Sequence, residues 1–77
     1  MNPKLPTLSG RQAVKAFERI GYHMVRQRGS HIRLRDNADP RHQPLTVPDH
    51  AVLKPGLLHQ LLRDANLSVD EFIALLK

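Results

Sequence analysis

Residues 26–35 read RQRGSHIRLR, and this stretch decides the fold. Arg28-Gly29-Ser30 is typical of a turn, because glycine and serine favour tight reversals of the chain. His31–Arg35 then alternates polar and apolar residues, which predicts a β-strand with one buried face. Ile32 and Leu34 are predicted to point into the core. The opposite face of that strand carries three basic residues, namely His31, Arg33 and Arg35.

Two further strands are predicted next to this one. Tyr22–Gln27 precedes the turn, although its alternation is interrupted where Met24 and Val25 stand together. Leu45–Val47 follows a polar segment, Asp36–Gln43, that is typical of a loop. A proline on each side of Leu45–Val47 favours an edge strand, because proline cannot donate a hydrogen bond to a neighbouring strand. Since the connections are short, an antiparallel meander is the simplest arrangement of the sheet.

The first predicted helix precedes the strands. Ser9-Gly10-Arg11-Gln12 fits a capping box, in which serine and glutamine satisfy backbone groups at a helix start. Gly10–Ile20 then carries apolar residues at helical spacing, and Gly21 suits the left-handed conformation that often ends a helix. Met1–Leu8 contains Pro3 and Pro6 and is predicted to be an extended lead-in.

Two more helices are predicted after the strands. Pro55 suits the first position of a helix, an apolar stripe follows it, and Asn66 is a plausible stop. Ser68-Val69-Asp70-Glu71 is a second capping box, which predicts a short last helix. The elements together predict an α+β fold with helices on one face of a three-stranded antiparallel sheet. The length favours a single domain over residues 1–77.

The composition narrows the classes of function. The chain lacks cysteine, which excludes disulfides and thiolate metal sites and favours a reducing cytoplasm. The start of the chain has no apolar run of signal-peptide length. No stretch approaches the ~20 apolar residues that span a bilayer. The sequence therefore predicts a cytoplasmic protein with no membrane partner.

The charge is strongly basic and unevenly placed. Lysine and arginine number 12 against 7 acidic residues, giving a formal net charge of +5. The window between Glu18 and Asp36 has no acidic residue, which favours contact with nucleic-acid phosphates over charge that serves solubility alone. That window contains Arg19, Arg26, Arg28, Arg33 and Arg35, together with His23 and His31.

Several motifs carry a family resemblance. Gly29-Ser30-His31 follows the first predicted strand, and Lys54-Pro55-Gly56 opens the second predicted helix. With the stretch Ser9–Phe17, the pair Gly21-Tyr22 and the closing Glu71-Phe72, these motifs occur in the same order over nearly the whole chain. The sequence resembles the HicA-type (YcfA-like) mRNA interferase toxins of HicA/HicB toxin–antitoxin systems. It departs from them at Leu57, where a family member often has threonine.

The resemblance implies a fold like a double-stranded-RNA-binding domain, α-β-β-β-α, here with a short extra C-terminal helix. It also implies a toxin that cleaves mRNA and is silenced by a cognate HicB-type antitoxin. No cofactor is expected. The histidine of the Gly-Ser-His motif is the catalytic residue of that family, and it corresponds to His31.

The residues themselves support an acid–base role for His31. An imidazole titrates near pH ~6.5, so it can both accept and donate a proton at neutral pH. RNA cleavage also needs positive charge at the reacting phosphate, which arginines on the same face can supply. Lys54 stands at a helix start, where backbone N–H groups attract phosphate. The candidate RNA-binding residues are Arg26, Arg28, Gly29, Ser30, Arg33, Arg35 and Lys54.

No metal site is predicted. The remaining histidines (His23, His42, His50 and His59) do not form a metal-ligand spacing. The leading hypothesis is therefore a metal-independent endoribonuclease that leaves a 2′,3′-cyclic phosphate. Two alternatives stay open at this point. One is a non-catalytic double-stranded-RNA-binding module, and the other is a pure protein-interaction domain.

Overall fold

The computed structural model describes residues 5–77. Residues 1–4, which begin the predicted lead-in, lie outside this range. The elements follow the order predicted from the sequence: α1 (Gly10–Glu18), β1 (His23–Arg28), β2 (His31–Arg35), β3 (Leu45–Pro48), α2 (Pro55–Asp64) and α3 (Val69–Leu75).

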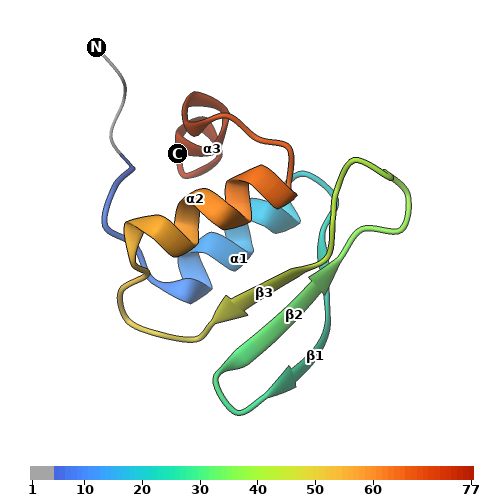
Figure 1. The fold of residues 1–77 in the computed structure, drawn as a ribbon, viewed down its shortest axis with the longest axis horizontal. Coiled ribbons are helices and arrows are strands. Elements are labelled where there is room, and N and C mark those ends of the chain that lie inside the picture. Colours follow the sequence, from blue (N-terminus) through green and yellow to red (C-terminus); the bar gives the residue numbers. More distant parts are fainter. Residues whose placement is uncertain (1–4) are drawn as a thin grey trace.

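The three strands form one antiparallel sheet in the order β1-β2-β3, so the predicted meander is confirmed. Helices α1 and α2 pack against β3 from the same side of the sheet, and α3 lies beyond them (Figure 1). β1 is the outer strand on the other edge, away from the helices (Figure 1). The predicted α+β architecture is therefore present, with one face of the sheet open.

The core lies between the helices and the covered face of the sheet. Ile32 and Leu34 of β2 are fully buried in it, as the alternation predicts. The Phe17 ring is central, because it packs edge-on against Tyr22 at a centroid distance of 5.8 Å and against Phe72 at 5.4 Å. Burial of such large apolar side chains is the main stabilising contribution in so small a protein.

Helix α1 starts as predicted and ends earlier. The capping box is formed, since the Ser9 hydroxyl accepts from the Gln12 N–H and the Gln12 side chain accepts from the Ser9 N–H. The regular helix stops at Glu18, two residues before the predicted Ile20, because the last turn tightens into bonds between residues three apart. Gly21 follows with a φ of +112°, as its predicted role requires.

Strand β1 contains a bulge that explains its broken alternation. The register pairs Met24 with Leu34 and Arg26 with Arg33, which leaves Val25 as the extra residue. Beyond the bulge, His23 pairs with Arg35. The strand also runs one residue later than predicted at each end, over His23–Arg28.

The remaining boundaries agree closely with the sequence. β3 includes Pro48, one residue more than predicted, and lies on a sheet edge where a proline is tolerated. Pro55 opens α2, and Asn66 follows its end with a φ of +57°, a left-handed value suited to a helix stop. Ser68 and Glu71 form the second capping box. No helix within residues 5–77 has both the length and the apolar character that crossing a bilayer would demand.

Candidate nucleic-acid interface

The open face of the sheet gathers basic side chains from two strands. Side chains that are directly opposite in an antiparallel pair lie on the same face. His31 is opposite Arg28, and Arg33 is opposite Arg26. These four residues therefore share the face that the helices leave uncovered.

A shallow depression of about 200 Å³ lies at the hairpin end of this face. It is open to solvent and has no deep cleft, as expected for a chain of this size. Its lining comes from all three strands: Arg26, Arg28, His31, Arg33 and Thr46.

Arg33 is the arginine of this depression whose position the fold fixes. Its Nη1 donates a hydrogen bond of 2.8 Å to the hydroxyl of Thr46, which is its register partner on β3. Arg33 is half-buried, whereas Arg26 and Arg28 are exposed. One guanidinium is thus held in place, and two others can move toward a ligand.

His31 is exposed at the start of β2. Over residues 5–77 its imidazole takes part in no hydrogen bond or ion pair. Both ring nitrogens are therefore available for hydrogen bonds to a bound molecule.

The positive charge of the depression is not compensated by acidic side chains of residues 5–77. No acidic side chain from the described part of the chain lines it. The ion pairs of residues 5–77 lie elsewhere and join Arg11 to Asp49, Arg41 to Asp39, and His42 to Asp36 and Asp39. An open face with three uncompensated arginines favours a polyanion.

The turn beside His31 is anchored to the rest of the fold. Gly29 has a φ of +52°, which glycine adopts without strain. The Ser30 carbonyl accepts a 2.6 Å hydrogen bond from the Asp49 N–H. The Asp49 carboxylate in turn accepts from the Arg11 guanidinium at 2.9 and 3.1 Å, and these bonds lower the pKa of Asp49. The hairpin end is thus tied to the first turn of α1.

The predicted RNA-binding residues fall into two groups. Arg26, Arg28 and Arg33 line the depression with His31. The other candidates do not line it. Arg35 shares the face but stands at the far end of β2 opposite His23, Gly29 and Ser30 form the turn, and Lys54 is the exposed N-cap of α2.

Comparison with known families decides the class of protein. A family model described as the HicA toxin of bacterial toxin-antitoxin systems matches residues 10–67, which include every element from α1 to α2. The chain belongs to the HicA toxin family. Searches of curated proteins and of solved structures found no match. Membership of a toxin–antitoxin family implies a cognate antitoxin as partner.

Thr46 of this HicA toxin is a site residue that was not predicted from the sequence. The alternation of Leu45, Thr46 and Val47 contained the necessary signal, since Leu45 and Val47 are buried and Thr46 therefore points to the open face. What the sequence could not give was its register partner, Arg33.

A second polar cluster, which was predicted only as loop, orders the segment between β2 and β3. His42 Nδ1 lies 2.8 Å from the Asp36 carboxylate, and its ring stacks on Tyr22 at 5.0 Å. The Tyr22 hydroxyl donates to the Gln43 carbonyl at 2.7 Å. Burial, with the nearby Asp36 carboxylate, raises the pKa of Tyr22 to about 12, so this hydroxyl stays protonated.

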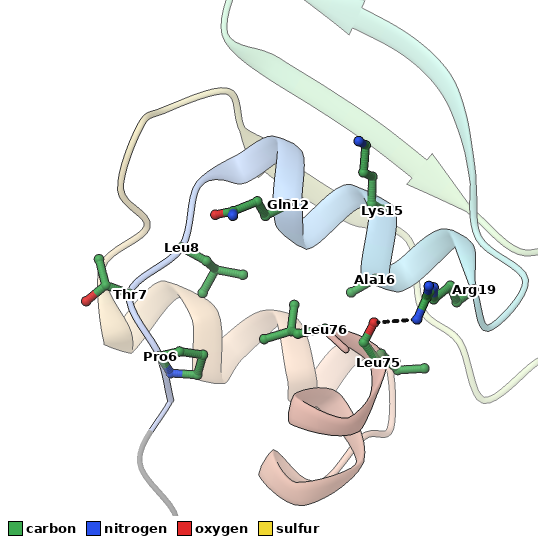
Figure 2. Close-up of a pocket in the computed structure, with 9 residues that line it drawn as sticks. All are labelled: Pro6, Thr7, Leu8, Gln12, Lys15, Ala16, Arg19, Leu75 and Leu76. Carbon is green, nitrogen blue, oxygen red and sulfur yellow. Dashed lines mark hydrogen bonds between the residues drawn. The ribbon is translucent and has the colours of Figure 1, made fainter.

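The HicA toxin also has a larger hollow of about 400 Å³ between the lead-in, α1 and α3 (Figure 2). Its apolar floor includes Leu8, Ala16 and Leu76. The cations Lys15 and Arg19 line it, and Arg19 donates hydrogen bonds to the carbonyls of Leu75 and Lys77 at 3.0 and 2.8 Å. Within residues 5–77, no histidine or carboxylate side chain lines this hollow. The basic depression is therefore the better candidate site.

Proposed function

We propose that this HicA toxin is a metal-independent endoribonuclease that cleaves mRNA, with His31 as its catalytic acid or base. The observation that carries the proposal is the placement of His31 in a depression with three arginines and no acidic neighbour from residues 5–77. A free imidazole supplies proton transfer at neutral pH, and the guanidiniums supply charge for a phosphate.

The chemistry is internal transfer of the phosphodiester. The ribose 2′-oxygen attacks phosphorus and gives up its proton to a base, while the bond to the 5′-oxygen breaks and that oxygen takes a proton. The products are a 2′,3′-cyclic phosphate and a 5′-hydroxyl. In this scheme His31 serves in the transfer, and Arg33, held by its hydrogen bond to Thr46, stabilises the charge that develops on phosphorus.

No protein-held metal is needed in this scheme. Over residues 5–77 there is no group of three or more histidine or acidic side chains placed to hold a metal ion. In-line attack by a neighbouring hydroxyl depends on proton transfer and charge stabilisation, which the side chains of the depression can supply.

The test is cleavage of RNA by the purified protein in excess chelator, with His31→Ala compared with His59→Ala. His59 is an exposed histidine on α2 and controls for loss of an imidazole elsewhere. We expect wild type and His59→Ala to cleave and His31→Ala to be slower by at least ~100-fold. Equal cleavage by His31→Ala would refute the site, and absence of cleavage by wild type would refute the enzyme.

A non-catalytic double-stranded-RNA-binding module is the second candidate. It is favoured by the fact that His31 is the one proton-transferring side chain among the five that line the depression. Wild-type protein that binds RNA tightly yet leaves it intact would support this candidate.

The cognate antitoxin is proposed to be of the HicB type and to act by covering the basic face. Acidic or apolar groups of a partner placed over Arg26 and Arg28 would keep phosphates from the depression. Loss of RNA binding on addition of the antitoxin would support this arrangement.

A further inference from the structure

Strand β1 is exposed along its whole length. Each of its residues is exposed, although it belongs to a sheet whose other strands bury alternate residues. Within residues 5–77 it forms one edge of the sheet and pairs with β2 alone, so its outer backbone N–H and carbonyl groups have no strand partner there. Such an edge is a template for another extended chain.

The same strand carries unusual apolar exposure. Met24 and Val25 are 50% and 43% exposed, and the third large exposed apolar residue of the described chain, Val52, is in the connection after β3. Met24 is opposite Leu34, so its side chain lies on the covered side of the sheet. Because β1 is the edge strand of the described sheet, no further strand lies next to Met24 on its outer side. A further strand would complete this apolar surface.

The two faces of the edge differ in chemistry. On the open face the edge presents His23, Arg26 and Arg28, and on the other it presents Met24 and Gln27. Residues of an added strand would alternate between these faces. Acidic residues would therefore meet the arginines at every second position, and apolar residues would extend the surface of Met24.

A second copy of this chain does not fit the edge. Pairing of two β1 strands would bring Arg26 and Arg28 close to their own copies, and like charges on neighbouring strands are destabilising. The bulge at Val25 also distorts a symmetric pairing. RNA does not fit it either, because phosphates gain nothing from Met24 and Val25. Charge complementarity thus favours an acidic protein segment.

We infer that the free edge of β1 is a docking strand for an extended segment of a partner protein in which acidic and apolar residues alternate. The occupant adds a fourth strand next to β1 and places its acidic side chains on the face that carries Arg26 and Arg28. This inference does not depend on the proposed ribonuclease activity, since it requires binding only.

The experiment uses the isotope-labelled full chain and two synthetic peptides. EVEVEVE alternates acidic and apolar residues, and EEEEVVV has the same composition without alternation. Amide resonances and peptide affinity are followed for wild type, for Met24→Glu and for Val52→Glu. Each variant replaces an exposed apolar residue (50% exposed for Met24, 57% for Val52) and changes the charge by the same amount, but only Met24 is on the edge.

We expect EVEVEVE to shift the amides of residues 23–28 most and to bind more tightly than EEEEVVV. Met24→Glu should weaken the affinity for EVEVEVE by about threefold to fivefold, which is the contribution of one cross-strand pair. The affinity of Val52→Glu for this peptide should match that of wild type. Equal affinity for both peptides, shifts centred outside β1, or equal loss in the two variants would each overturn the inference. The amide spectrum of each variant shows whether it is folded. The comparison of the two peptides uses wild-type protein and so does not depend on the folding of a variant.

Discussion

Arg33 and Thr46 show how a single contact organises the candidate site. Arginine on an exposed strand ordinarily samples many rotamers, and ordering it on a ligand costs conformational entropy. The 2.8 Å bond to Thr46 fixes the guanidinium before a ligand arrives. Preorganised donors are more effective than mobile ones at a charged transition state.

We predict that Thr46→Val weakens RNA binding or cleavage by about threefold to tenfold, on the order of 1 kcal/mol, without loss of stability. Valine keeps the shape and the strand preference but cannot accept the bond from Arg33. Thr7→Val is the control, since Thr7 is exposed in the lead-in. Equal activity in both variants would show that Arg33 needs no fixing.

Asp36 gives a prediction about pH. Its side chain is only 8% exposed, and the hydrogen bond from His42, followed by that from the Ala38 N–H, lowers the pKa of Asp36 below its ordinary value of 3.8. A carboxyl with a lowered native pKa stabilises the fold above its unfolded pKa, and this contribution is lost as pH falls through the native pKa. Asp39, whose pKa is lowered to about 2 mainly by Arg41, acts in the same direction.

We therefore expect the thermal midpoint of wild type to fall as pH drops below about 4. Asp36→Asn should lower the midpoint at pH 7 and flatten its pH dependence, because the variant lacks the carboxylate that is titrated. Thermal unfolding followed by circular dichroism between pH 7 and pH 2 measures both effects. A pH dependence as steep as that of wild type would contradict this role.

For individual residues, the sequence predicted side-chain orientation wherever the residues lie in a regular strand. Alternation placed His31 and Arg33 on the open face and Ile32 in the core, because a strand has a fixed period of two. It could not reveal the contact of His42 with Asp36, since loop conformation follows no period. The sequence therefore predicted which side chains lie on the open face, but it did not predict which residues each side chain contacts.

At the scale of elements, the bulge in β1 decides which residues join the open face. Strict alternation from Arg28 would place Met24 on the open face and His23 on the covered one. The extra residue Val25 reverses this, so that His23 pairs with Arg35. The adjacent Met24 and Val25 signalled an irregularity in the sequence, but a bulge and a strand end give the same local pattern.

The start of α1 is fixed by close contact with β3. A Cβ on Gly10 would clash with the backbone carbonyl oxygen of Pro48. The Gly10 N–H also donates to the His50 carbonyl at 2.9 Å. The capping box predicted this helix start correctly from neighbouring residues, but the need for glycine at this position arises from the tertiary packing.

We predict that Gly10→Ala destabilises the protein by about 1–3 kcal/mol, the range for overpacked sites. Gly56→Ala is the matched control, because Gly56 is also in the first turn of a helix and a Cβ there meets open space. It should be neutral or stabilising by up to about 1 kcal/mol. Urea unfolding of both variants measures the difference, and equal stabilities would contradict the close packing of α1 on β3.

Across the whole molecule, the charge distribution separates the open basic face of the sheet from the loops that carry the ion pairs. The net charge is +5, and the acidic residues that form ion pairs within residues 5–77 are in the loops, at Asp36, Asp39 and Asp49. The arginines of the depression are left unpaired by comparison. The basic window in the sequence predicted this asymmetry. Its two strands pair in one hairpin, so their basic side chains gather on the same face of the sheet.

We predict that RNA affinity falls steeply with salt, with a slope in log–log form of about −2 to −3 if the arginines of the depression contact phosphates. Arg28→Gln should reduce the magnitude of that slope by about 0.7–0.9. Arg63→Gln, an exposed arginine near the end of α2, is the control and should leave the slope nearly unchanged. A slope that responds equally to both variants would place RNA on a different surface.

The measurement that tests the proposed reaction most directly is analysis of the ends produced from one defined RNA in excess chelator. Transfer to the 2′-oxygen assisted by His31 predicts a 2′,3′-cyclic phosphate and a 5′-hydroxyl from wild type, and intact RNA when the ribose at the cleaved position is replaced by deoxyribose. A 5′-phosphate with a 3′-hydroxyl, or cleavage next to the deoxyribose, would contradict it.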